Sequence, residues 1–194
     1  MPEDRGGEFE SYLGEDIRHR GVTAWVARLR VPIGFTVAVL TMWLADPTAR
    51  SLAIGGSIAA AGEALRFWAA GHLNKSREVT VSGPYRWMAH PLYLGTAVIG
   101  AGVAIACRSM LVALAIAAYL AATLVIAVRR EEAFLRAKFG ADYANYRGGV
   151  RIGSAALEVS RRFSSARARA NREYRAAFGL LVALAALAWL VSVR

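Results

Sequence analysis

Cysteine is nearly absent from this sequence, and charged residues are few. Cys107 is the only cysteine among 194 residues, so no intrachain disulfide can form and a cysteine-based metal cluster is excluded. The sequence predicts no metal site. The residues before the first apolar run are acidic and polar, and we therefore expect no cleavable signal peptide. With 56% hydrophobic residues, the distribution of apolar side chains decides between a soluble and a membrane protein.

Acidic residues are scarce relative to basic ones. The chain has 14 Asp and Glu against 24 Lys and Arg, a net charge of +10. Such a surplus attracts nucleic-acid phosphates or anionic lipid head groups. No RNA- or DNA-binding motif accompanies it, and the arginine-rich stretch over residues 161–175 directly precedes an apolar run. We therefore expect anionic membrane lipids as partners, and no nucleic acid.

Long apolar runs are the most prominent positive feature of the sequence. They are Val31 to Ala45, Ser51 to Ala70, Leu92 to Cys107, Met110 to Val128 and Ala176 to Val193. Each is close to the ~17–25 residues that a helix needs to cross a bilayer. A water-soluble single domain is thereby excluded. The predicted fold is all-α, a polytopic integral membrane protein with about five transmembrane helices. Small residues inside the runs predict close helix contacts; they are Gly55, Gly56, Gly62, Gly95, Gly100 and Gly102.

The basic residues predict an orientation for these helices. Twenty of the 24 Lys and Arg residues lie before the first run, between the second and third runs, or between the fourth and fifth. Because Lys and Arg near span ends stay on the cytoplasmic side, the N-terminus is expected there and the C-terminus on the opposite side. The expected organisation is a cytoplasmic arm (1–30), helices one and two (31–71), a core with helices three and four (72–150), a basic interfacial segment (151–175) and helix five (176–194).

Two polar, aromatic segments on the expected cytoplasmic side carry the candidate chemistry. In the first, Gly83-Pro84 predicts a turn, and Pro91 suits the first position of a helix, which places His90 at that helix's N-terminus. Free backbone N–H groups and the positive end of the helix dipole favour a bound carboxylate or phosphate there. A structural cap with a histidine at the water boundary fits this segment equally well.

The second segment, residues 129–146, continues the fourth apolar run. Phe139-Gly140 predicts a helix stop, with a short helix beyond it that carries Tyr143 and Tyr146 on one face. Glu131 and Glu132 follow two arginines at the membrane edge. Taken alone, the segment is also typical of a snorkelling charge cluster with interfacial aromatic residues.

Together, the two segments resemble one known family. The motifs are Gly83-Pro84-Tyr85, His90-Pro91-Leu92-Tyr93, Glu131-Glu132 and the stretch from Phe139-Gly140 to Tyr143 and Tyr146. In this order and spacing they resemble the isoprenylcysteine carboxyl methyltransferases and their relatives, which include phospholipid N-methyltransferases. The resemblance covers roughly residues 63–150. One departure is Ala89, where the family usually has Arg; Arg86 or Arg130 could supply the charge.

The resemblance implies a membrane methyltransferase that uses S-adenosylmethionine as methyl donor. Its acceptor would be lipophilic or lipidated, either a prenylcysteine-like carboxylate or a lipid head group, and would enter from the bilayer. The implied catalytic residues are Glu132 and Arg130. The implied donor-binding residues are Tyr85, His90, Pro91, Tyr93, Glu131, Glu132, Tyr143 and Tyr146. An aromatic face beside the sulfonium cation would contribute ~0.5–2 kcal/mol.

Three further polar residues are candidates for the wall of the acceptor cavity. Glu63 and Arg66 lie three apart inside the second run, where ionisable residues are costly and are usually paired or line a pathway. Two interpretations of Glu63 and Arg66 stay open: a structural ion pair, or part of the cavity wall. His72, at the end of the same run, either lines the pocket or has no role in it. Two other functions stay open as well: an NAD(P)H-dependent sterol-type reductase and a non-catalytic membrane scaffold.

Overall fold

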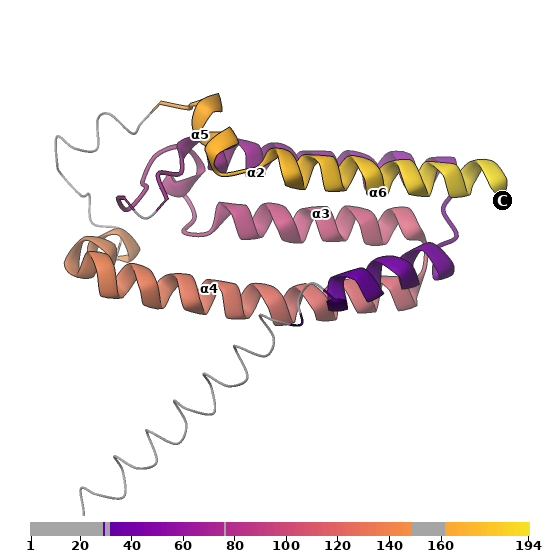
Figure 1. The fold of residues 1–194 in the computed structure, drawn as a ribbon, viewed down its shortest axis with the longest axis horizontal. Helices are drawn as coiled ribbons and strands as arrows, with labels where there is room; N and C mark the ends of the chain where they lie inside the picture. Colours follow the sequence, from indigo (N-terminus) through magenta and orange to yellow (C-terminus); the bar gives the residue numbers. More distant parts are fainter. Residues whose placement is uncertain (1–28, 30–31, 76, 149–161) are drawn as a thin grey trace, which may run out of the picture.

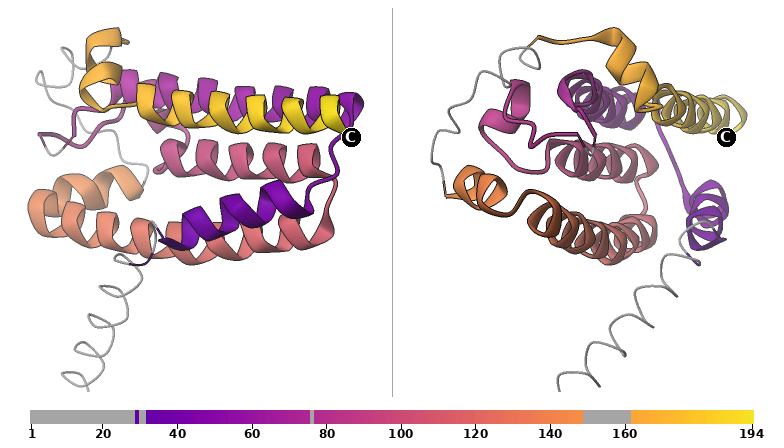
Figure 2. Two further views of the ribbon diagram at one scale, coloured as in Figure 1. Left: turned by 45° about the vertical axis from the view of Figure 1, so that its right-hand side comes forward. Right: turned by 60° about the vertical axis from the view of Figure 1, so that its left-hand side comes forward.

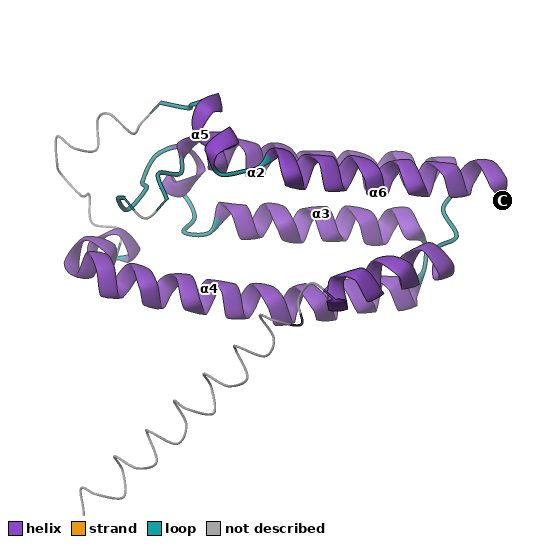
Figure 3. Ribbon diagram, in the orientation of Figure 1, coloured by secondary structure: helices purple, strands orange, loops and turns teal. Residues whose placement is uncertain are grey.

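The computed structural model describes residues 29, 32–75, 77–148 and 162–194, and every regular element in these ranges is helical (Figure 3). The all-α prediction is therefore confirmed for the described residues. The expected arm over 1–30, apart from Leu29, and the first part of the basic segment, 151–161, lie outside them.

The helices form an elongated bundle along a common axis (Figures 1 and 2). Along the chain they are a helix at Pro32–Leu44, α2 (Ala49–His72), the 3-10 turn η1 (Gly83–Arg86), α3 (Pro91–Cys107), α4 (Met110–Arg147), α5 (Ser165–Ala170) and α6 (Tyr174–Val193). α2 packs mainly on α3, which also contacts α4, while α5 and α6 lie against α2. The C-terminus lies at the end of the bundle opposite α5.

The bundle is apolar on its outside. Among the described helices, α4 and α6 are long and apolar enough to cross a membrane by length and composition, and Pro32–Leu44 and Pro91–Cys107 are shorter apolar helices. α2 is 24 residues long, but Glu63 and Arg66 interrupt its apolar sequence. Large apolar side chains are exposed on several helices, among them Phe35, Trp43, Met110, Leu114, Phe178, Leu181 and Trp189. A surface of this kind is suited to a bilayer. Two of the described helices thus meet the length and composition expected of a membrane-crossing helix, whereas the sequence predicts about five.

Glycines bring the backbones of α2 and α3 into contact. A Cβ atom at Gly55 would lie 2.4 Å from the carbonyl oxygen of Gly102, and one at Gly62 would lie 2.8 Å from that of Gly95. Only glycine allows such an approach, so these four residues confirm the expected close helix contact. α4, α5 and α6 pack against this α2–α3 pair.

Side-chain caps define the turns between the first helices. Thr48 and Ser51 form a capping box at the start of α2. The Ser51 hydroxyl also donates to the carbonyl oxygen of Ala106 at 3.0 Å, and the Asp46 N–H donates to that of Cys107 at 2.9 Å. These bonds tie the first turn to the end of α3, which fixes the register of the bundle at that end.

The opposite end of α2 is closed by the segment around α5. The Asn171 side-chain amide donates to the carbonyl oxygens of Ala70 and Leu73, at 2.9 and 3.0 Å, and the Ser164 N–H donates to that of Gly71 at 3.0 Å. The last carbonyl groups of a helix have no partner within the helix, so these contacts satisfy them. They also position the chain that leaves α2 toward the candidate site.

Candidate functional site

The two motif segments meet at one end of the bundle. The loop with η1 leads into α3, and the end of α4 lies against it (Figure 2). Between them is a cavity of about 360 Å³, a volume typical of small-molecule sites. The residues that line it are Leu73, Lys75, Glu78, Val79, Thr80, Tyr85, Ala89, His90, Leu92, Tyr93, Ala127, Arg130, Glu131, Phe134, Leu135, Tyr143 and Tyr146.

Pro91 begins α3, as predicted, and His90 precedes it as the N-cap residue. The rigid proline ring suits the first helical position and keeps His90 outside the α region, at φ −132° and ψ 59°. No side chain caps this helix start. Pro91 has no N–H, and the N–H groups of Tyr93 and Leu94 donate to the His90 carbonyl oxygen, both at 3.1 Å, so the Leu92 N–H is the backbone donor left for an anion here. The helix therefore places both an imidazole and the Leu92 N–H at the edge of the cavity.

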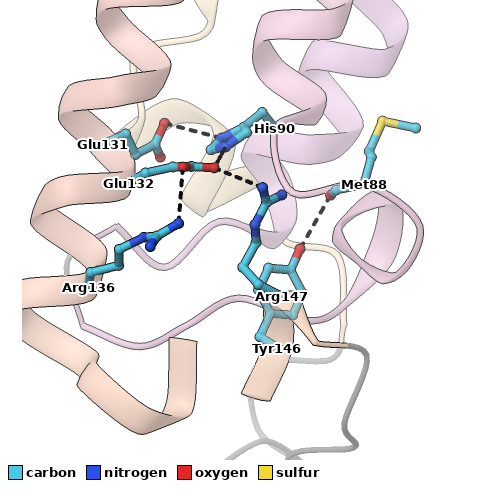
Figure 4. Close-up of polar contacts among 7 residues, drawn as sticks. All are labelled: Met88, His90, Glu131, Glu132, Arg136, Tyr146 and Arg147. Atoms are coloured by element: carbon cyan, nitrogen blue, oxygen red, sulfur yellow. Dashed lines mark hydrogen bonds and ion pairs between the residues drawn. The ribbon is translucent and has the colours of Figure 1, made fainter. Parts of the chain in front are cut away.

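Two glutamates from α4 point at His90 (Figure 4). The carboxylate oxygen of Glu131 lies 3.7 Å from its Nδ1, and that of Glu132 lies 3.3 Å from its Nε2. The two carboxylates therefore hold the imidazole from both sides. Of the pair, Glu131 lines the cavity.

Glu132 is the centre of an ion-pair network (Figure 4). Besides His90, its carboxylate lies 3.1 Å from a guanidinium nitrogen of Arg147 and 3.6 Å from one of Arg136. Arg136 is one helical turn further along α4, whereas Arg147 belongs to the segment that returns after Gly140. The network joins α4, the returning segment and the start of α3.

The charges of His90 and Glu131 support one another. Glu131, and then Glu132, raise the pKa of His90 above its ordinary value against the opposing effect of burial. Burial alone would raise the pKa of Glu131, but the neighbouring His90 and the Tyr93 hydroxyl outweigh burial and leave it below its ordinary value. Near neutral pH, the arrangement thus favours an imidazolium between two carboxylates.

Gly140 turns the chain back over the cavity. Its φ of 45° and ψ of −115° break the helical geometry of α4, so the predicted helix stop is confirmed. The Tyr146 hydroxyl donates to the carbonyl oxygen of Tyr85 at 2.7 Å. It also donates to that of Met88 at 3.3 Å (Figure 4). The neighbouring ring of Tyr143 is only 1% exposed. The returning segment thereby forms one wall of the cavity.

The tyrosine hydroxyls of this wall stay protonated at physiological pH. Burial raises the pKa of Tyr146 to about 12 and also raises the pKa values of Tyr85 and Tyr143. The hydroxyl oxygen of Tyr143 is buried without a hydrogen-bond partner. A neutral hydroxyl can both donate and accept, so Tyr143 is positioned to bond a ligand in the cavity.

Glu63 and Arg66 belong to a half-buried charge cluster whose members do not line this cavity. The Nε of Arg66 is 3.5 Å from the Glu63 carboxylate and 2.6 Å from that of Glu173, which sits at the start of α6. Arg66 also donates to the carbonyl oxygen of Leu92, at 3.3 Å, and to the Thr96 hydroxyl. The cluster therefore links α2, α3 and α6 behind the cavity.

His72 is buried at the end of α2, beside the loop that carries η1. Its Nδ1 lies 3.1 Å from the carbonyl oxygen of Trp68, and a Cβ atom at Gly83 would lie 2.6 Å from the imidazole. His72 thus packs beneath the turn at Gly83, which has a positive φ of 58°. Of the three candidates for the acceptor wall, none lines the cavity described above.

Sequence reasoning missed Lys75, Glu78 and Arg147. Lys75 and Glu78 lie in the loop between α2 and η1 and line the cavity. The Glu78 Oε1 is buried without a hydrogen-bond partner. The sequence signal that could have indicated them is the pair of opposite charges, Lys75 and Glu78, shortly before the Gly-Pro-Tyr motif. Arg147 follows the last motif tyrosine, but its pairing with Glu132 depends on the turn at Gly140.

Two buried atoms without a hydrogen-bond partner, Glu78 Oε1 and Tyr143 OH, belong to residues that line this cavity. A carboxylate accepts hydrogen bonds, a hydroxyl does both, and a helix start attracts anions. The tyrosine rings provide flat apolar walls. This combination suits a small molecule that carries an ammonium or hydroxyl group, a carboxylate and an aromatic ring.

Comparison with known proteins identifies the family. No curated protein matches this chain, and no solved structure does. A family model described as phospholipid methyltransferase matches residues 29–142, which is more than half of the chain. The match spans the helices α2 and α3, η1 and most of α4, including His90 and both glutamates. The chain therefore belongs to the phospholipid methyltransferase family, and the resemblance carried by its paired motifs is confirmed.

Proposed function

We propose that this protein is an S-adenosylmethionine-dependent methyltransferase that acts on a lipophilic acceptor in the membrane. The observation that carries this proposal is the cavity at the start of α3, with its unpartnered Glu78 and Tyr143 atoms beside His90. The family supports methyl transfer to lipid, and the cavity supports the donor.

The cavity offers a partner for each charged part of the donor. Glu131 already faces His90 and Tyr93, so the free carboxylate oxygen of Glu78 is our assignment for the donor's ammonium. The positive end of the α3 dipole, the Leu92 N–H and His90 suit its carboxylate. Tyr85, Tyr93, Tyr143 and Tyr146 supply aromatic walls for the adenine or the sulfonium.

When bound, S-adenosylmethionine supplies an electrophilic methyl carbon for in-line displacement, in which the new bond to the acceptor forms as the bond to sulfur breaks. Catalysis then depends on alignment and the exclusion of water. Arg130 lines the cavity and is assigned to an anionic part of the acceptor. Glu132 contacts His90 and Arg147, so we assign it to positioning His90. A carboxylate acceptor needs no base, whereas an amine acceptor needs a base to take its proton.

The proposed placement in the membrane has the long helices as transmembrane spans, with the N-terminus and the site on the cytoplasmic side and the C-terminus on the other. The apolar character of α4 and α6 and the exposed apolar side chains support it. The uneven distribution of Lys and Arg supports the orientation. Basic residues near α5, such as Arg169 and Arg172, would face anionic lipid head groups.

The test is donor binding by the purified full chain in lipid nanodiscs. Calorimetry with S-adenosylhomocysteine, the demethylated donor, is expected to give saturable binding with a stoichiometry of about one, while NADPH gives none. Saturable NADPH binding without binding of S-adenosylhomocysteine would replace the proposal with the reductase function. Absence of binding to either would leave a non-catalytic membrane protein.

A further inference from the structure

A second cavity lies deeper in the bundle. Its volume is about 490 Å³, and it lies between the helix at Pro32–Leu44, α3, α4 and α6. Its lining residues are Gly34, Val37, Ala38, Thr41, Met42, Thr96, Ile99, Gly100, Val103, Ile116, Tyr119, Leu120, Gly179, Val182, Ala183, Ala186 and Leu187. None of them carries a charge, so the cavity is suited to a neutral, apolar occupant.

The polar atoms of its wall are largely satisfied within the helices. The Thr41 hydroxyl donates to the carbonyl oxygen of Val37 at 2.7 Å, and the Thr96 hydroxyl donates to that of Leu92 at 2.9 Å. Each bond is formed one turn back along the same helix, which is common for threonine in apolar surroundings. These two threonines therefore present mainly methyl groups to the cavity.

The two cavities follow one another along the same pair of helices. On α3, Leu92 lines the first cavity and Thr96 the second. On α4, Ala127 lines the first and Leu120 the second. At 1.5 Å per residue these offsets correspond to roughly 6 Å and roughly 10 Å along the helix axes. A molecule held in the second cavity therefore lies within one or two helical turns of the first cavity.

Arg66 lies between the two cavities along the bundle axis. It donates to the carbonyl oxygen of Leu92, at the first cavity, and to the hydroxyl of Thr96, at the second. Its ion pairs with Glu63 and Glu173 place charged groups at this level, while the second cavity itself has no charged lining. The lining of the protein thus changes from polar at the first cavity to apolar at the second, which matches the polar head and apolar chains of a lipid.

We propose that the second cavity binds one acyl chain of the phospholipid acceptor, with the head group extending toward the first cavity. This inference rests on the proposed function, because the first cavity is taken as the donor site. The bilayer is as apolar as the cavity wall, so the cavity adds little affinity for hydrocarbon as such. Its contribution is orientation: a held chain aligns the head group with the methyl donor.

α6 is essential to this site. It supplies Gly179, Val182, Ala183, Ala186 and Leu187, although the family match ends at residue 142. Glu173 at its start holds Arg66 at the level between the cavities. The C-terminal helix of this chain is therefore assigned to binding of the acceptor, a role outside the matched family region.

A matched pair of substitutions on α6 tests the proposal. Ala183→Phe fills the cavity, whereas Ala188→Phe adds the same volume at an exposed position five residues further along the helix. Full-length protein is reconstituted in nanodiscs that contain phosphatidylethanolamine with a diazirine at the end of one acyl chain. After irradiation, mass spectrometry of peptides locates the adducts.

In the wild type, adducts are expected on the cavity face of α6 and on α3 between Thr96 and Val103. Ala183→Phe should lower their yield at least fivefold, and Ala188→Phe should leave it unchanged. If Ala183→Phe does not fold, Ala186→Phe serves as the second cavity variant. Adducts spread evenly around α6, or a yield insensitive to both cavity variants, would overturn the proposal.

Binding of S-adenosylhomocysteine by the same variants separates this inference from the proposed function. Both substitutions lie outside the first cavity, so calorimetric affinity is expected to stay at the wild-type value. Loss of chain labelling with donor binding retained supports the acyl-chain site. If the wild type labels as expected but fails to bind S-adenosylhomocysteine, the proposed function fails while the chain site stands.

Discussion

The Tyr146 hydroxyl donates a hydrogen bond to the backbone carbonyl oxygen of Tyr85, 2.7 Å away, and so ties the end of α4 to the loop before α3. It shares a second bond with the carbonyl oxygen of Met88, at 3.3 Å. The last tyrosine of the second motif is therefore in contact with the first motif. This contact closes the cavity on one side and makes the returning segment part of the site.

Tyr146→Phe should open this side of the cavity. It removes the hydrogen bonds to Tyr85 and Met88 and should cost ~0.5–1.5 kcal/mol, which corresponds to a weakening of S-adenosylhomocysteine binding of roughly 2- to 13-fold. Calorimetry provides the measurement. Tyr174→Phe, at an exposed position at the start of α6, is the control and should have no effect. Equal affinities for wild type and Tyr146→Phe would contradict the role given to this contact.

Glu78→Gln should weaken binding of ligands that carry the donor's ammonium. The substitution keeps the shape and removes the charge, so S-adenosylhomocysteine should lose about tenfold in affinity, the effect of removing a charge-assisted hydrogen bond. Binding of 5′-methylthioadenosine, which has the same adenosine but lacks the amino acid part, should not change.

Asp142→Asn is the matched control for Glu78, because it removes a carboxylate charge at an exposed position of the returning segment. It should leave both affinities unchanged. If Glu78→Gln weakens both ligands equally, Glu78 contacts the ribose and the ammonium assignment is wrong.

Stability should depend on pH through His90. Its pKa is raised and that of Glu131 is lowered, so the pair is fully charged between the two values. Because the folded-state pKa of His90 lies above its unfolded value of about 6.5, its contribution is complete below pH 6.5 and is lost as the pH rises through the raised pKa. Thermal unfolding of wild type and His90→Gln between pH 5.5 and 9 measures this. The wild type should lose melting temperature relative to His90→Gln with rising pH, and parallel curves would refute the pairing.

Gly140→Ala should destabilise the returning segment through backbone strain alone. An added Cβ meets nothing within 4 Å, but the φ of 45° with ψ of −115° is unfavourable for an L-residue, at a cost of ~1–3 kcal/mol. Thermal unfolding and binding of S-adenosylhomocysteine should both show the loss. Gly179→Ala in α6 is the control: its Cβ also meets nothing within 4 Å, and its helical backbone accepts alanine. A Gly140→Ala protein as stable as wild type would mean that the turn has another geometry.

Two neighbouring glycines of α2 should respond differently to the same change. A Cβ at Gly55 would lie 2.4 Å from the carbonyl oxygen of Gly102, whereas one at Gly56 would lie 3.8 Å from a methyl carbon of Leu184. Gly55→Ala must therefore push α2 and α3 apart and should cost ~1–3 kcal/mol, as overpacking does. Gly56→Ala should be neutral or slightly stabilising, since alanine favours a helix. Thermal unfolding in detergent compares the two, and equal losses would argue against the close α2–α3 contact.

The local features of the site were predictable because each depends on a few neighbouring residues. Pro91 defines the start of α3 through its fixed φ, and Gly140 allows the turn in α4 through its freedom at positive φ. The order of the motifs was enough to indicate the family. The glycines at Gly55 and Gly62 predicted close helix contacts, although only the structure shows which glycines of α3 they face.

Contacts between distant charged residues were not predictable from periodicity. Glu63 and Arg66 were expected either to pair or to line a cavity, and the third member, Glu173, comes from the start of α6. Arg147 reaches Glu132 only because the chain reverses at Gly140. Such pairings depend on how whole helices are packed, and helical periodicity contains no information about the partner helix.

The sequence by itself determined the helices, the positions of their breaks and the family, since apolar runs, prolines and glycines act on the backbone within a few residues. Only the tertiary structure decided which carboxylates face His90, that Glu78 lacks a partner, and that an apolar cavity lies along α3 and α4 beyond the first. These features depend on contacts between side chains of different helices. The relative position and rotation of the helices determine these contacts, and no single segment of the sequence contains that information.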